Sequence, residues 1–275
     1  MTKAPLVSVI MPAYNAAEYI KEAVVSILDQ SLGDLELIIV DDGSTDDTWE
    51  IMEKLAGSDN RITILRNDKN RNICYTLNKA IDAARGKYIA RMDSDDWSYS
   101  DRLQKQFTYL ESHEGAVIVG GSIEVCDREM NVLNTRSYEL EDVKIRGKLL
   151  RYSQFAHPCV MYSSEAVREA GKYDETLFDA EDYDLYFRLG NIGAFGNLPD
   201  TVLKLRTHPQ SISYKKITRQ AWLTLKIKLK AIFVYGYKAG LGDVLHLLLH
   251  LFGNLLVPAG LKFKAFNLYR RFVPR

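Results

Sequence analysis

The sequence predicts an α/β protein built on a Rossmann-like, doubly wound and mostly parallel sheet, with a helical extension at its C-terminal end. Short apolar runs rich in β-branched residues alternate with stretches of helical period through the first hundred residues, and this alternation favours a parallel sheet. Three of the predicted strands end in polar, carboxylate-rich turns, which is typical of the ligand-binding edge of such a sheet. The 275 residues are 47% hydrophobic and 26% charged, a composition that excludes disordered, collagen-like and coiled-coil chains.

The first two strand–helix units are predicted between residues 6 and 55. Residues 6–11 predict a buried strand, and Asn15 is placed to cap the helix that follows it. Residues 35–40 predict a second buried strand, after which Ser44 or Thr45 can cap the next helix. Strand and helix therefore alternate from the start of the chain.

The same alternation continues to the acidic turn at residues 93–96. A third strand is predicted at residues 62–65, a third helix at 73–84 and a fourth strand at 87–92. The fourth strand runs directly into the acidic turn, so we expect that turn to lie at the carboxyl edge of the sheet.

The pattern is less regular beyond the acidic turn. Residues 127–151 are polar and poorly periodic, and they predict an excursion over the surface. The other predicted elements are a helix at 99–113, a strand at 116–125, a strand at 155–162, a short helix at 164–170, a helix with an acidic start at 181–189 and a final strand at 202–205.

Charge divides the chain into two parts near residue 214. Residues 1–214 hold 24 basic and 35 acidic side chains, a net charge of −11, whereas residues 215–275 hold 12 and 1, a net charge of +11. We therefore expect one large domain at 1–214, with halves at about 1–98 and 99–214, and a basic, apolar tail at 215–275.

Cysteine usage and the N-terminal segment predict a cytoplasmic protein. Cys74, Cys126 and Cys159 are too few and too scattered for a disulfide framework or a CxxC metal site. The N-terminal segment MTKAPLVSVIMP reads as a buried strand rather than as a signal peptide.

The tail has two open interpretations. Residues 244–261 are uncharged over 18 positions, the lower limit for a spanning helix, but they include histidine, glycine, asparagine and proline, so a simple span is not expected. The preceding segment LTLKIKLK alternates with a period of two, which leaves its helicity open. The tail either packs on the large domain or in a dimer, or it binds a membrane surface peripherally.

Three carboxylates crowd the turn after the fourth strand. Asp93, Asp95 and Asp96 lie within four residues and repel one another unless a cation neutralises them. Mg²⁺ or Mn²⁺ is the natural partner, because both prefer oxygen ligands and commonly bind carboxylates together with substrate phosphates. The alternative is a solvated turn in which Asp96 or Ser98 caps the next helix.

A second acidic pair follows the second strand. Gly43 allows a tight turn there, and a turn with a helix cap explains Gly43 and Ser44 without any ligand. Two adjacent carboxylates, Asp41 and Asp42, are explained less well, because one must face the cleft, where it can accept a hydrogen bond from a base or ribose. Tyr14 offers a flat stacking face, although ordinary packing is the alternative.

Two later segments carry further candidates. Glu181 and Asp182 open a helix, where acids either complement the helix dipole or supply a general base of raised pKa. Arg206 and His208 follow the final strand and can clamp phosphate oxygens or simply hold the loop. The chain contains no GxGxxG, GxxxxGK[ST] or GxSxG motif, so dinucleotide-binding, P-loop and hydrolase interpretations find no support.

Six segments taken in order resemble the family 2 glycosyltransferases, which have the GT-A fold. The segments are VSVIMPAYNAAEYI, LIIVDDGSTDDT, GKYIARMDSDDWSYSDRL, FAHPCVMYSSEAV, AEDYDLYFRL and LRTHPQSIS, and the likeness covers roughly residues 5–214. The resemblance implies an inverting enzyme of bacterial polysaccharide or lipopolysaccharide synthesis, which moves a sugar from a nucleotide diphosphate, usually UDP, to an acceptor hydroxyl with a divalent metal.

The resemblance also implies roles on the donor side. Pro12, Tyr14 and Asp42 match positions that hold the base, with Asp42 matching the carboxylate that bonds uracil. Arg71 belongs to a donor-side loop in which the family usually shows glycine after the basic residue. This chain has Asn72 there, and because asparagine tolerates a positive φ we expect the turn to be kept.

The resemblance implies metal-binding and catalytic roles in the same way. Asp93 and Asp95 match the DxD pair, with Asp95 as the direct metal ligand and Asp93 nearer the ribose and metal waters. Asp182 matches the catalytic base, and Arg206 and His208 match a pair near the diphosphate.

The sequence gives less support to three other functions. A nucleotidyltransferase would need a glycine-rich, basic loop after the first strand, where this chain has MPAYNAAEY, and a non-catalytic nucleotide-sugar binding or scaffold protein would lack the carboxylates. A processive synthase would carry QxxRW, which is absent. We therefore expect transfer of one sugar, with a β product, to a glycan or polyprenyl-diphosphate-linked acceptor, at the inner face of the cytoplasmic membrane and without nucleic acid as a partner.

Overall fold

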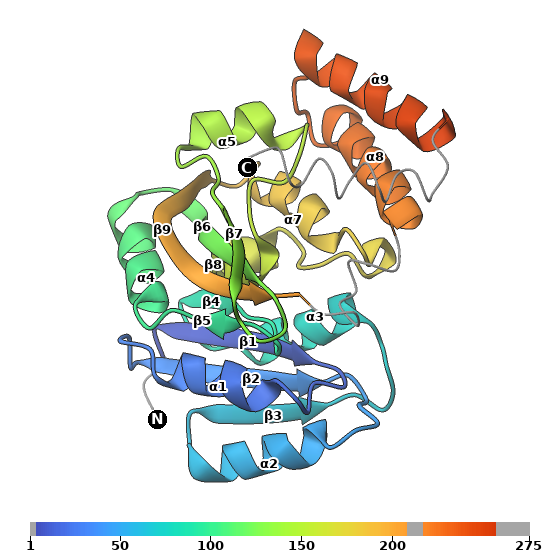
Figure 1. Cartoon of the computed structure of the whole chain (residues 1–275). Helices are drawn as coiled ribbons and strands as arrows, with labels where there is room; N and C mark the ends of the chain where they lie inside the picture. The colour runs from blue at the N-terminus through green and yellow to red at the C-terminus, as the bar shows by residue number, and fades with distance from the viewer. Residues whose placement is uncertain (1–3, 208–216, 257–275) are drawn as a thin grey trace.

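A single nine-stranded sheet organises the computed structural model, which describes residues 4–207 and 217–256 (Figure 1). The strand order is β3-β2-β1-β4-β8-β6-β9-β5, and β7 pairs with β6 outside this path. The strands are β1 (Val7–Ala13), β2 (Leu35–Asp41), β3 (Ile62–Arg66), β4 (Tyr88–Arg91), β5 (Trp97–Ser98), β6 (Ala116–Cys126), β7 (Val132–Arg136), β8 (Met161–Ser163) and β9 (Ala194–Arg206). The first four are mutually parallel and β6 is parallel to β9, whereas β5, β7 and β8 are antiparallel to their neighbours. The predicted α/β class with a mostly parallel sheet is confirmed.

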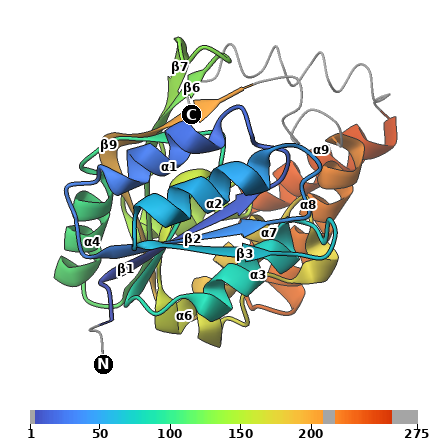
Figure 2. The same cartoon turned by 90° about the horizontal axis from the view of Figure 1, so that it is seen from below.

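Helices cover both faces of this sheet and enclose one apolar layer on each (Figure 2). The α1 layer contains buried side chains of α1 (Ile20–Leu28), α2 (Thr48–Ser58) and α4 (Arg102–Ser112). The α7 layer contains those of α3 (Ile73–Ala83), α5 (Asp142–Leu149), α6 (Ser164–Glu169), α7 (Glu181–Leu189) and α8 (Ile217–Phe233). Strand periodicity produces the division, because Val9 and Met11 of β1 face the α1 layer while Ile10 faces the α7 layer.

The three cysteines are free and buried. Cys74 belongs to the α7 layer and Cys159 to the α1 layer. Burial raises the pKa of Cys159 to about 11, so this thiol stays protonated at neutral pH.

The predicted helix caps after β1 and β2 are wrong. Helix α1 begins after Tyr19, and α2 begins after Asp47. Asn15 lies in the preceding loop with a φ of 49°, where its Oδ1 accepts a hydrogen bond from Thr45 N at 2.9 Å. The backbone N–H of Asn15 in turn donates to Ser44 Oγ at 2.9 Å. These side chains join two loops at the carboxyl edge of the sheet instead of starting helices.

Two further predictions about the second half are corrected. The expected excursion at residues 127–151 contains β7 and α5. Strand β7 is exposed along almost its whole length, and α5 buries only Ile145 and Leu149, so neither shows a clear apolar period. The expected strand at residues 155–162 is instead a 3-10 turn, η1 (His157–Cys159), followed by β8. Pro158 has no backbone N–H to give to a sheet, which explains the turn.

The tail begins with two helices that lie together at the end of the molecule opposite α2 (Figure 1). They are α8 and α9 (Leu241–Leu256). Ile227 and Ala231 of α8 are fully buried in the α7 layer, so helical packing prevails over the period-two pattern of the segment. Within the two described ranges, none of the helices combines the length and hydropathy that crossing a bilayer requires.

Candidate functional site

The acidic turn after β4 brings three carboxylates together. Oxygen atoms of Asp93, Asp95 and Asp96 all lie within 4.8 Å of one another. Asp96 is 2% exposed; its Oδ1 accepts a hydrogen bond from Arg206 N at 2.8 Å, while its buried Oδ2 has no hydrogen-bond partner among the described residues. Helix α4 begins after Asp101, so the alternative in which Asp96 or Ser98 caps that helix is wrong.

The electrostatics of this turn favour a cation. Burial raises the pKa of Asp96 well above its ordinary value, and the Asp95 and Asp93 carboxylates add to the effect. Burial also raises the pKa of Asp93, although Arg91 opposes the shift through an ion pair of 2.5 Å. Clustered carboxylate oxygens with one unpartnered buried oxygen fit a hard divalent ion such as Mg²⁺ or Mn²⁺.

Arg206 holds the acidic turn in place. Its guanidinium donates to the backbone oxygen of Asp95 at 2.8 Å, to Glu22 Oε2 at 2.5 Å and to the backbone oxygen of Arg128. The side chain is therefore engaged by protein acceptors, and its predicted contact with a diphosphate stays a prediction. The predicted partner His208 lies outside the described residues.

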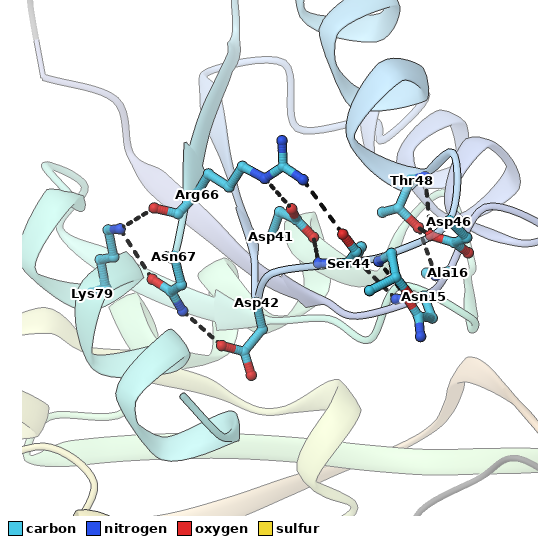
Figure 3. Close-up of polar contacts among 11 residues, drawn as sticks. Asn15, Ala16, Asp41, Asp42, Ser44, Asp46, Thr48, Arg66, Asn67 and Lys79 are labelled. Carbon is cyan, nitrogen blue, oxygen red and sulfur yellow. Dashed lines mark hydrogen bonds and ion pairs between the residues drawn. The ribbon is translucent and has the colours of Figure 1, made fainter. Parts of the chain in front are cut away.

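The two acids at the end of β2 have different partners (Figure 3). Asp41 is fully buried, accepts from Ser44 N at 3.1 Å and pairs with Arg66 Nε at 3.0 Å. Asp42 Oδ1 accepts from Asn67 Nδ2 and from Arg71 N, both at 2.8 Å, and its other oxygen points away from Asn67 (Figure 3). Asp42 is therefore the member of the pair that can meet a ligand.

The backbone around Asp42 is tightly specified. Gly43 has a φ of 73°, and a Cβ there would lie 2.6 Å from the backbone of Lys69, so only glycine fits. Asn72 has a φ of 74°, and its Oδ1 accepts from Cys74 N at the start of α3. The expected asparagine turn is thus confirmed, and it sets the backbone N–H of Arg71 against Asp42.

Three other residues predicted to bind the donor lie near the end of β1 and in the loop before α3. The guanidinium of Arg71 lies 4.6 Å from the ring centroid of Tyr75. Pro12 is half-buried near the end of β1, and Tyr14, two residues farther, exposes 48% of its surface. The Tyr14 ring is therefore not part of the core and is available for stacking.

The first turn of α7 supplies a third group of carboxylates. Burial, together with the nearby Asp182, raises the pKa of Glu181 to about 7. Burial also raises the pKa of Asp182, while the helix backbone and Arg91 oppose the shift. A carboxylate of raised pKa is a competent proton acceptor near neutral pH.

Two residues at the centre of the site were not identified from the sequence. Arg91, the last residue of β4, is 3% exposed and acts electrostatically on Asp93, Glu181 and Asp182. An arginine that closes an apolar strand just before an acidic turn was the available signal. The second is His157, whose Nε2 forms a hydrogen bond of 2.8 Å with Tyr173 Oη and whose Nδ1 lies 4.0 Å from Glu181 Oε1.

Comparisons with known protein sequences point to one family. The model of Glycosyl transferase family 2 matches residues 8–171. The chain is 31% identical over 253 residues to an uncharacterized glycosyltransferase of Haemophilus influenzae, covering 88% of this chain and 77% of that protein. It is 30% identical over 238 residues to a chondroitin synthase of Escherichia coli, covering 86% of this chain and 34% of that protein.

Comparisons with solved structures agree with the fold. TarS 1-349 of S. aureus, in complex with UDP-GlcNAc, superposes with a TM-score of 0.69 at 18% identity, over 92% of this chain and 76% of that chain. A mannosyltransferase from Pyrobaculum calidifontis, in complex with GDP-Man and Mn²⁺, superposes with a TM-score of 0.66 at 19% identity, over 93% and 71%. Both likenesses support the GT-A arrangement of the sheet.

Proposed function

The chain belongs to glycosyltransferase family 2 and is a glycosyltransferase of GT-A fold. We therefore propose that it transfers one sugar from a UDP-sugar to a hydroxyl of a glycan or lipid-linked oligosaccharide. The transfer inverts the anomeric centre and forms a β-glycosidic bond in cell-surface polysaccharide synthesis. The observation that carries the proposal is that Arg91 acts on both the acidic turn and the first turn of α7. The proposed metal ligands and the proposed base thereby both lie within electrostatic reach of one buried cation.

Asp95 and Asp93 would hold the metal through their carboxylate oxygens. When bound, Mg²⁺ or Mn²⁺ supplies positive charge that stabilises the departing diphosphate. The protein's own contribution is to keep the ligand oxygens in place, which Arg206 does through Asp96 Oδ1 and the backbone oxygen of Asp95. The Mn²⁺ that accompanies GDP-Man in the mannosyltransferase complex is consistent with this choice of ion.

Asp182 is proposed as the catalytic base. It takes the proton from the acceptor hydroxyl while that oxygen attacks the anomeric carbon from the face opposite the diphosphate. One displacement inverts the configuration, so an α-linked donor gives a β product. The raised pKa of Asp182 suits this role, because the carboxylate then accepts a proton near neutral pH.

Asp42 is proposed to bind the base of the donor. Its Oδ1 is already held by Asn67 and by Arg71 N, so its orientation is set before a nucleotide arrives. Pro12 and Tyr14 complete this side, and Tyr14 has the exposure needed to stack on a base. The TarS structures with UDP and UDP-GlcNAc favour uracil, and the GDP-Man complex makes guanine the alternative to test.

The outer side of α9 is proposed to rest on the inner face of the cytoplasmic membrane. Every described side chain that is exposed on α9 is apolar, and we call this set the α9 face: Leu241, Val244, Leu245, Leu248, Leu249, Phe252 and Leu255. An apolar helix face within a tail whose residues 215–275 carry a net charge of +11 suits an anionic bilayer surface. A lipid-linked acceptor would be presented at the same surface.

A screen of nucleotide sugars tests the activity. UDP release is measured for each donor, with GDP-sugars in parallel, in the presence and absence of polyprenyl-diphosphate-linked saccharides, and the product's anomeric configuration is then assigned. We expect release that depends on both one UDP-sugar and an acceptor, with a β product. Asp182→Asn should lower kcat by about 100-fold or more with little change in donor affinity. A product of retained configuration would overturn single displacement.

A further inference from the structure

Helix α8 and the loop after it contact α7 and the segment just before it, so that contacts fall on both sides of Asp182. Upstream of the base, Arg219 lies 3.5 Å from Asp179 Oδ2, and its guanidinium covers the Phe178 ring at 3.6 Å. Downstream, Lys230 and Tyr235 reach Asp184, two residues after the base. The tail therefore brackets the segment that carries Asp182.

The contact at Asp184 is the most specific of these. The Asp184 side chain is fully buried. Its Oδ2 is paired with Arg188 Nε at 2.8 Å, and its Oδ1 accepts from Lys230 Nζ at 3.1 Å and from Tyr235 Oη at 2.9 Å. Arg188 belongs to α7 itself, so Lys230 and Tyr235 are the groups outside α7 that hold the Asp184 carboxylate.

We propose that Lys230 and Tyr235 are positioning residues for the Asp182 base, so that docking of α8 against Asp184 is a condition for full catalytic rate. The inference rests on the proposed role of Asp182. Asp184 lies about half a turn from Asp182 on the same helix, so a change in the contact at Asp184 shifts the turn of backbone that carries the base. Proton transfer is sensitive to such movement, because a displacement near 1 Å can cost about 100-fold in rate.

Two pairs of matched variants test this proposal in the whole chain. Lys230→Met is compared with Lys228→Met, because Lys228 is also on α8 but donates to the backbone oxygen of Arg151. Tyr235→Phe is compared with Tyr237→Phe, whose lost hydroxyl donates to Phe187 O, farther along α7 from the base. Melting temperature, kcat and the KM for the donor sugar are measured for each protein at a temperature where all are folded.

We expect Lys230→Met and Tyr235→Phe to lower kcat by about ten-fold or more while donor KM stays within about two-fold of wild type. Lys228→Met and Tyr237→Phe should keep kcat within about two-fold, even where the melting temperature falls. Lys230→Arg, which keeps the charge, should restore most of the rate. Equal kcat in the test and control variants, or a change confined to donor KM, would overturn the proposal.

Asp182→Asn is measured in parallel to separate the two ideas. If Asp182→Asn is as active as wild type, the proposed base is wrong and the positioning role fails with it. If Asp182→Asn is inactive while Lys230→Met and Tyr235→Phe match their controls, only the positioning role is wrong.

Discussion

The backbone N–H of Arg206 donates to Oδ1 of Asp96 over 2.8 Å, which joins the end of β9 to the acidic turn after β4. The two residues are far apart in sequence, and the guanidinium of Arg206 reinforces the link at the backbone oxygen of Asp95. The proposed metal site is thus assembled from two strands that meet only in the folded protein.

Arg206→Gln should damage both this link and the stability of the fold. We expect the free energy of unfolding to fall by about 2 kcal/mol, because buried backbone acceptors and Glu22 lose their partner. The Mn²⁺ concentration for half-maximal activity should rise several-fold. Arg128→Gln is the control, since Arg128 forms a solvent-exposed pair with Glu18, and such pairs contribute little to stability. Denaturant titration and metal titration together decide the prediction.

Asp95→Ala should abolish turnover, because clustered carboxylates and a diphosphate both require charge compensation by a divalent ion. Excess EDTA should have the same effect on wild type, and Mg²⁺ or Mn²⁺ should reverse it. Asp101→Ala is the matched control, since Asp101 pairs with Lys105 at the surface. Normal turnover by Asp95→Ala, or by wild type in EDTA, would refute the metal assignment.

The two neighbouring acids after β2 should respond differently to the same substitution. Asp42→Asn should raise the KM for the UDP-sugar by about ten-fold and leave kcat nearly unchanged, because one acceptor that faces the base becomes a donor. Asp41→Asn should leave KM unchanged and lower the free energy of unfolding by about 1 to 3 kcal/mol, since it weakens the buried contacts with Arg66 and Ser44. Identical effects of the two variants would contradict the division of roles.

Glu181 should make the stability of the metal-free protein depend on pH. Its pKa rises from 4.5 to about 7 on folding, so the native state binds the extra proton between these values and the free energy of unfolding falls as pH increases through that window. Glu181→Gln removes this loss. The free energy of unfolding of the variant, relative to that of wild type, should therefore rise by about 2 to 3 kcal/mol between pH 4.5 and 7.5, at roughly 1.4 kcal/mol per pKa unit. Denaturant titrations across this range in EDTA provide the test, and parallel curves would disprove it.

Charged substitutions on the α9 face should release the protein from membranes. We expect Leu245→Glu and Leu249→Glu to abolish flotation with anionic vesicles, whereas Val143→Glu, on the exposed surface of α5, should have no effect. Binding of wild type should require anionic lipid and weaken with salt. Point variants are preferable to truncation after residue 214, because α8 contributes Ile227 and Ala231 to the core. Equal flotation with neutral vesicles at high salt would indicate hydrophobic insertion without an electrostatic contribution.

Much of the pattern of strands and helices could be predicted where the elements are apolar and locally determined. The strands at Leu35–Asp41 and Ile62–Arg66 differ from the predicted ranges by a single residue at the end, and α7 begins and ends as predicted. Asp41 is held by Ser44 N and Arg66, whereas the role of Asp42 at the donor base stays a prediction.

The remaining features depend on contacts that no local pattern encodes. Strand β7 is formed from exposed residues and exists because β6 offers it an edge. The period-two pattern of α8 does not predict a helix. The helix is stabilised by burial of Ile227 and by the contact of Lys230 with Asp184. Arg91 gains its position between two acidic groups only when β4 and α7 come together.

The placement of the cysteines makes the two sides of the sheet separately observable. Cys74 is sealed in the α7 layer and Cys159 in the α1 layer, so an alkylating reagent reaches either thiol only when its own layer opens. Modification rates of the two thiols in native protein, followed peptide by peptide in a mass spectrometer, would therefore report the opening equilibrium of each side without any engineered probe. Equal rates would mean that both apolar layers open together in one cooperative transition.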